Sequence, residues 1–180
     1  MQDPDLNLLI TAARKAGELA KNYDFRKLKV WEKEGGAGPV TEADIEVDRM
    51  LFEYLTSARP DYGWLCEEST SDIPHYEKNC AFVIDPIDGT RDFIKGGNNW
   101  SHSFSVVKNG KVSAAVVYVP KQDLLFSAYL GGGSWLNGER LHIKALNKSG
   151  EFDLIAAKPV SYTHLRAHET REDRVCRLVL

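Results

Sequence analysis

The most informative segment of the chain is Phe82–Thr90, which reads FVIDPIDGT. Its apolar beginning predicts a buried strand that ends at Ile84, because Pro86 has no N–H to continue a ladder and favours a turn. Asp85 then stands at the carboxyl end of the strand. We expect the turn to fold Asp88 back beside Asp85.

The two residues that close this segment suit a bound phosphate. Gly89 permits a close approach of the backbone, and Thr90 can open a helix. The start of a helix presents unpaired N–H groups and a partial positive charge, which attract a phosphate. Asp-Pro and Asp-Gly are also common turn dipeptides, so each piece alone is weak.

Working outward, other charged residues precede this segment, and each has a structural alternative. Glu67 and Glu68 follow an apolar run, where they could form a solvated strand end. Asp44 lies three residues after Thr41, which is also the spacing of a helix capping box. Lys33 in isolation is typical of a solvated loop.

The combination of Glu67, Asp85 and Asp88 indicates a metal site. If these carboxylates converge, they raise one another's pKa, and a phosphate dianion could not approach them unaided. Divalent cations resolve both problems. Oxygen ligands without His or Cys favour Mg²⁺, which can polarise a water and hold a phosphoryl group.

Hydrophobic periodicity predicts helices first and then a mostly antiparallel sheet, an α+β arrangement. Asn109-Gly110 predicts a hairpin turn between two of the strands. His102 falls within a predicted strand, where we expect it to be packed or hydrogen-bonded rather than a ligand. The predicted helices are 6–22 and 41–57, and the predicted strands are 63–66, 80–84, 100–107, 112–119, 124–130 and 140–143.

Composition excludes several classes of protein. The chain has 180 residues, 43% hydrophobic, with a formal net charge of -3, so no basic field attracts nucleic acid or an anionic membrane. An odd count of three cysteines without metal spacing argues against a disulfide framework and favours a reducing cytoplasm. The N-terminus lacks the form of a signal peptide, and no apolar run reaches the length of a membrane span.

The last twenty residues differ in kind from the rest. They are rich in arginine and histidine and show no clear period. We expect residues 1–159 to form the domain, and residues 160–180 to be a non-native tail such as a translated linker. A natural amphipathic terminal helix is the alternative.

Three motifs, taken together, resemble the inositol monophosphatase family: PVTEAD at Pro39–Asp44, CEES at Cys66–Ser69, and FVIDPIDGT at Phe82–Thr90. The resemblance implies the layered α-β sandwich shared with fructose bisphosphatases, here as the N-terminal subdomain and the start of the second. It also makes a homodimer an expectation. Two further stretches, Ala58–Leu65 and Arg91–Gly96, resemble the 3'(2'),5'-bisphosphate nucleotidase branch.

The resemblance implies roles for matching positions, with two or three Mg²⁺ ions as cofactor. One ion would take Glu67, Asp85 and the Ile87 carbonyl, and a second would take Asp85 and Asp88. Asp44 and Thr90 would orient and deprotonate the attacking water, with Glu67 also in the catalytic set. The substrate phosphate would meet Asp88, Gly89, Thr90 and Lys33.

The implied function is Mg²⁺-dependent hydrolysis of a small soluble phosphate ester. The nucleotidase likeness favours 3'-phosphoadenosine 5'-phosphate, and inositol 1-phosphate and histidinol phosphate are alternatives. The family also has a metal-binding aspartate in a Trp-Asp motif of its second half, whereas Trp135 here precedes Leu136. We therefore expect this chain alone to be weak or inactive. A catalytically silent metal- or anion-binding protein is the alternative of another class.

Overall fold

The structure, a computed structural model, describes residues 3–33, 38–68 and 78–142. Residues up to Leu141 form one unit. Three helices are present in the described part: α1 (Pro4–Lys21), α2 (Glu42–Ala58) and the short α3 (Thr90–Ile94). None of the described helices is long and apolar enough to cross a membrane. The predicted tail, residues 160–180, lies outside the described residues.

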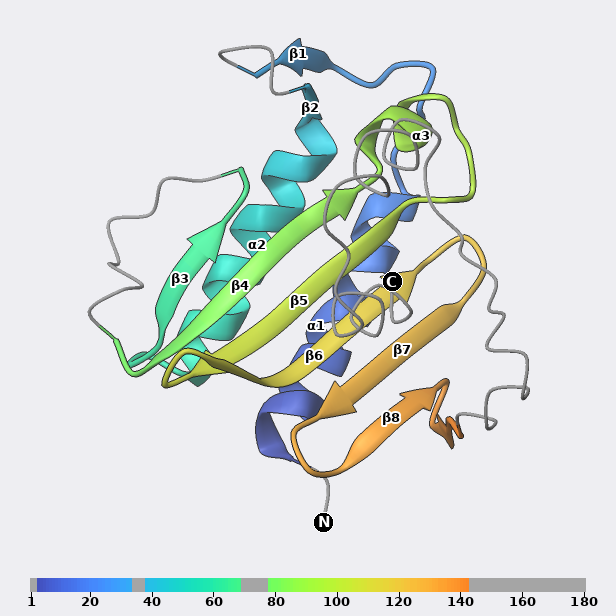
Figure 1. Cartoon of the computed structure of the whole chain (residues 1–180). Coiled ribbons are helices and arrows are strands. Elements are labelled where there is room, and N and C mark those ends of the chain that lie inside the picture. Colours follow the sequence, from blue (N-terminus) through green and yellow to red (C-terminus); the bar gives the residue numbers. More distant parts are fainter. Residues whose placement is uncertain (1–2, 34–37, 69–77, 143–180) are drawn as a thin grey trace, which may run out of the picture. The chain divides into compact units, whose positions relative to one another are not determined.

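Among the described residues, two sheets accompany the helices (Figure 1). The larger has seven strands in sequence order from β3 to β9; β3 and β4 are parallel, and the other neighbours are antiparallel. The smaller is the antiparallel pair of β1 and β2. The strands are β1 (Val30–Glu32), β2 (Pro39–Thr41), β3 (Gly63–Cys66), β4 (Cys80–Asp88), β5 (Ser101–Lys108), β6 (Lys111–Val119), β7 (Leu124–Tyr129), β8 (Gly133–Leu136) and β9 (Glu139–Arg140).

Helix α1 begins where the sequence offers two start signals. The Asp3 side chain accepts hydrogen bonds from the backbone N–H groups of Asp5 and Leu6, and Pro4 occupies the first helical position. The buried stripe of α1 faces the sheet, and Gly17 lies against β6. A Cβ at Gly17 would stand 2.5 Å from the Tyr118 ring, so only glycine allows this close approach.

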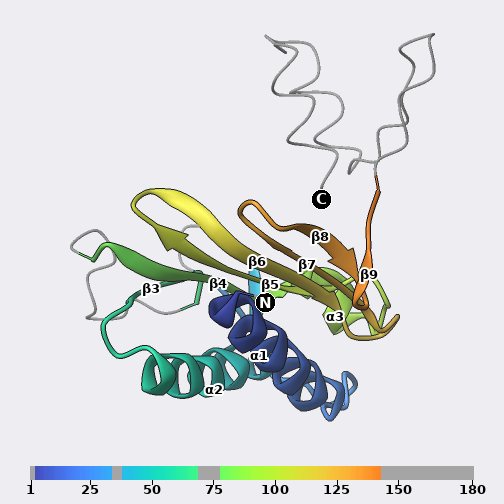
Figure 2. The same ribbon diagram turned by 90° about the horizontal axis from the view of Figure 1, so that it is seen from below.

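Helices α1 and α2 cover the same face of the large sheet (Figure 2). The hydrophobic core lies between these two helices and the sheet, since alternate residues of β5 and β6 are buried on that face. The largest wholly buried side chains include Trp64, Trp100, Phe82 and Phe104. The predicted α+β arrangement is confirmed.

Some of the predictions for individual turns and strands are confirmed and others are wrong. Asn109 and Gly110 both have positive φ, 50° and 75°, as the predicted hairpin turn requires. His102 is wholly buried, as predicted. The predicted strand end at Ile84 is wrong, because β4 continues to Asp88 through a shift in register. The sequence also failed to indicate β1, β2 and β8, which are three or four residues long.

Candidate active site

The irregular end of β4 positions the central acidic residues. Asp85 pairs with Ser103 and Asp88 with Ser101, so two residues of β4, Pro86 and Ile87, stand opposite one residue of β5. That count defines a β-bulge, a device that bends a strand and re-aims its side chains. The bulge, Pro86-Ile87, therefore separates Asp85 from Asp88 without ending the strand.

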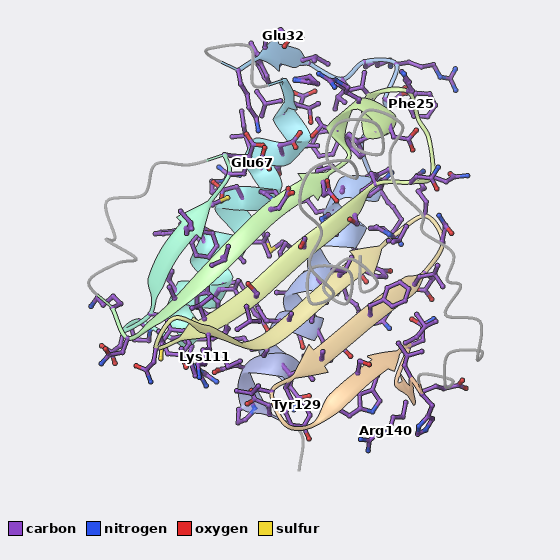
Figure 3. The ribbon with its side chains drawn as sticks, in the orientation of Figure 1. Phe25, Glu32, Glu67, Lys111, Tyr129 and Arg140 are labelled. Atoms are coloured by element: carbon purple, nitrogen blue, oxygen red, sulfur yellow. The ribbon has the colours of Figure 1, made fainter. Side chains whose placement is uncertain are left out.

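Parallel pairing brings Glu67 to the same end of the sheet. Cys66 lies opposite Ile84, and the Glu67 N–H donates to the Ile84 carbonyl at 3.2 Å. Figure 3 shows Glu67 at the end of β3. Glu67 thus continues beside Asp85, as the carboxyl ends of neighbouring parallel strands must.

The first turn of α2 supplies Asp44, which is wholly buried. Its Oδ2 accepts hydrogen bonds from the backbone N–H and the hydroxyl of Thr41, completing a capping box. Its Oδ1 lies 3.5 Å from the Thr90 Oγ1. Burial raises the pKa of Asp44, although the bonds from Thr41 oppose the rise. One carboxylate therefore both caps the helix and faces Thr90, so the two alternatives for Asp44 are compatible.

Thr90 lies at the start of α3, directly after Gly89. The Thr90 hydroxyl donates to the Ile87 carbonyl at 3.0 Å, a shorter contact than the one to Asp44. Gly89 has a φ of +88°, and a Cβ there would stand 3.0 Å from the Asn99 carbonyl oxygen. Glycine is thus required at this turn both by the backbone conformation and by the available space.

The neighbouring carboxylates act on the ionisation of Asp85. Burial, together with the charges of Glu67, Asp88, Glu68 and Asp44, raises the pKa of Asp85 from 3.8 to about 7. Its Oδ1 is buried and has no hydrogen-bond partner among the described residues. A buried carboxylate oxygen without a donor is costly, and a bound cation would relieve that cost.

Lys33 lies between two of these carboxylates. Its Nζ is 2.6 Å from Glu67 Oε1 and 2.7 Å from Glu68 Oε1. Burial by itself would lower the pKa of Lys33, but the hydrogen bonds that its ammonium donates to Glu67 and Glu68 outweigh this effect, and the pKa is raised. The side chain is only 18% exposed, so the interpretation of Lys33 as a solvated loop residue is wrong.

Glu68 is a residue of the cluster that the sequence did not single out as a site residue. Its side chain is 6% exposed, against 52% for Glu67. Burial raises the pKa of Glu68, while Lys33 works against the rise. The only signal in the sequence was its position beside Glu67, and the solvated strand end inferred from that signal does not hold for Glu68.

The donor set has the chemistry of a site for a hard divalent cation. The donors present are carboxylates and the Ile87 carbonyl, which are ligands that Mg²⁺ prefers. Within the described ranges, no three His, Cys, Asp or Glu side chains are already gathered to hold an ion. In this arrangement the Glu67 carboxylate is paired with the Lys33 ammonium, and the Asp85 Oδ1 has no hydrogen-bond partner among the described residues.

The model of the inositol monophosphatase family matches residues 1–179. The chain belongs to this family. Inositol-1-monophosphatase of Rhizobium meliloti (strain 1021) is 37% identical over 142 residues, covering 78% of this chain and 53% of that protein. Nus factor SuhB of Escherichia coli (strain K12) is 36% identical over 139 residues, covering 77% and 52%.

The fold agrees with the family as well. The chain superimposes on Thermotoga maritima IMPase with a TM-score of 0.72 and 33% identity, over 79% of this chain and 54% of that one. The α-β sandwich implied by the resemblance is thereby confirmed. The chain spans about half the length of the curated relatives it matches.

Proposed function

We propose that the protein is a metal-dependent phosphatase that hydrolyses a small phosphate monoester. The observation that carries the proposal is the buried Oδ1 of Asp85, which has no hydrogen-bond partner within the described ranges and lies among four other carboxylates. Such a cluster is unfavourable for the folded chain by itself, and perturbed carboxylates of this kind are concentrated at functional sites. Membership of the inositol monophosphatase family supports the same reaction class.

We assign the metal to the residues at the end of β4. Asp85 and Asp88 would hold it with Glu67 and the Ile87 carbonyl. When bound, Mg²⁺ supplies charge neutralisation and lowers the pKa of a coordinated water. Lys33, displaced from Glu67, would then carry its ammonium toward the phosphate oxygens, where a cation stabilises developing negative charge.

The chain's own residues would move the proton. Thr90 Oγ1 can accept a hydrogen bond from the attacking water while its own proton points to Ile87 or Asp44. A raised pKa makes the Asp44 carboxylate a stronger base than an exposed aspartate, which suits general base catalysis. The backbone N–H groups of Gly89 and Thr90 are proposed to orient the phosphate. Positioning supplies most of the catalysis in phosphoryl transfer.

For the substrate, two phosphate esters have separate support. The resemblance of Ala58–Leu65 and Arg91–Gly96 to the bisphosphate nucleotidase branch favours 3'-phosphoadenosine 5'-phosphate. The name of the Rhizobium meliloti relative, inositol-1-monophosphatase, favours inositol 1-phosphate. Histidinol phosphate is the remaining candidate. Phosphate release from all three, side by side over a magnesium titration, distinguishes them.

The same assay tests the proposal as a whole. We expect magnesium-dependent release with a strong preference for one ester, and loss of release in Asp88→Asn. This chain alone is expected to turn over weakly, because it lacks the Trp-Asp motif that the family resemblance implies. Magnesium binding without release from any ester by a chain extended to the relatives' length would favour the silent binding protein instead.

A further inference from the structure

His102 lies beneath the bulge and is wholly buried. It is the single residue of β5 that stands opposite both Pro86 and Ile87, because Ser103 pairs with Asp85 and Ser101 with Asp88. A bulge leaves one residue of its strand out of the ladder, so its backbone groups need partners from elsewhere. The His102 ring provides one of them, through a hydrogen bond between Nδ1 and the Pro86 carbonyl.

The chemistry of this bond fixes the state of the ring. A carbonyl oxygen can only accept, so Nδ1 must carry the proton. Burial lowers the pKa of His102 to about 4, so the ring is neutral at neutral pH. The other nitrogen, Nε2, is then a bare acceptor, and it is buried without a hydrogen-bond partner among the described residues.

The surroundings of the ring are aromatic. Trp100 meets it edge-on with centroids 5.5 Å apart, Phe104 stacks on it at 5.8 Å, and Tyr118 lies at 6.4 Å. A phenylalanine would suit this cage better, because it would leave no polar atom unpaired. Packing therefore does not explain a histidine here, whereas the bond to the Pro86 carbonyl does.

We propose that His102 is a positioning residue for the bulge Pro86-Ile87: the His102 Nδ1–H holds the Pro86 carbonyl and so fixes Asp85 and Asp88 relative to each other. Because the Pro86 carbonyl accepts from the buried His102 ring, the neighbouring Ile87 carbonyl is available to accept from Thr90 and to bind the metal. The inference rests on the proposed metal site, since its consequence is the geometry of the ligands. It is an outer-shell contact of the kind that tunes metal affinity.

Two substitutions separate the effect of the hydrogen-bond donor at His102 from the effect of the packing of its ring. His102→Phe keeps the ring and removes the donor. His102→Asn removes the ring and keeps a donor, because Asn Nδ2 and His Nδ1 are the same number of bonds from Cα. Phe104→Leu is the matched control, since it disturbs the same cage without touching the bond to Pro86.

Two measurements are made on the whole chain. Hydrogen exchange in EDTA follows the amides of Ile87–Thr90, and isothermal titration follows Mg²⁺ binding. We expect His102→Phe to speed exchange there and to weaken Mg²⁺ binding by about tenfold. His102→Asn should lose more thermal stability and yet bind Mg²⁺ more tightly than His102→Phe. Phe104→Leu should lower stability with Mg²⁺ binding unchanged.

The proposal is overturned if His102→Phe leaves both the exchange and the Mg²⁺ affinity at wild-type values, or if Phe104→Leu weakens Mg²⁺ binding equally. If His102→Phe does not fold, His102→Asn decides, because a loss of Mg²⁺ affinity there would mean that the donor is not what matters. A wild-type chain that binds no Mg²⁺ would refute the proposed function, and the exchange experiment would still test His102.

Discussion

Neutralising Asp85 should stabilise the protein when metal is absent. The carboxyl has its pKa raised from 3.8 to about 7, so the folded chain disfavours its ionised form. The stability that this group contributes is complete below about pH 4 and is lost as the pH rises through 7. The shift corresponds to about 4 kcal/mol at most, and relaxation and solvent around the partly exposed cluster reduce it to about 2 kcal/mol.

The assay is thermal unfolding of Asp85→Asn in EDTA. At pH 8 the melting temperature should rise by about 4–8 °C for a chain of this size. At pH 4.5 the gain should largely vanish, because wild-type Asp85 is then protonated. Magnesium should raise the melting temperature of the wild-type chain and not that of the variant, since Asp85 is a ligand of the proposed metal.

Asp61→Asn is the matched control, because Asp61 is exposed and should leave the melting temperature unchanged at both pH values. A loss of stability in Asp85→Asn at pH 8, or an equal gain at both pH values, would refute the electrostatic reasoning.

Three further substitutions test other contacts. Lys33→Met should lower the free energy of unfolding in EDTA by about 1–3 kcal/mol, since Glu68 loses its buried counter-ion. Denaturant unfolding measures this loss, and Mg²⁺ should restore part of the lost stability; an unchanged free energy of unfolding would contradict the ion pair. Thr90→Val should lower phosphate release by about 100-fold with Mg²⁺ affinity retained by calorimetry; unchanged turnover would remove Thr90 from the mechanism. Gly89→Ala should destabilise more than Gly110→Ala, since both have positive φ but only Gly89 meets an atom within 4 Å; equal losses of melting temperature would contradict the role of space.

Local chemistry made part of the fold predictable. The Asn109-Gly110 turn depends only on its two residues, and both adopt the positive φ that the hairpin needs. The end of β4 was missed because the absence of an N–H at Pro86 is locally a strand terminator. In the structure the strand continues past Pro86 through the bulge, where the His102 ring, sixteen residues later in the chain, bonds to the Pro86 carbonyl.

The candidate site, like the fold, was predictable from the sequence only in part. The sequence drew attention to Asp85 and Asp88 because they follow an apolar run and combine with Glu67 into a set of acidic residues. It could not indicate that Glu68 is buried, since that depends on Lys33, which lies 35 residues earlier in the chain. Burial and pairing across such separations follow from the sheet's topology, which local patterns do not encode.

The most direct test is a crystal structure of the chain grown with Mn²⁺, examined by anomalous scattering. Mn²⁺ accepts the same oxygen ligands as Mg²⁺. We predict an anomalous peak in contact with Asp85 Oδ1, with Glu67 turned toward it and away from Lys33. A map without a peak at Asp85, in which Lys33 Nζ still bridges Glu67 and Glu68, would contradict the assignment of this cluster as the metal site.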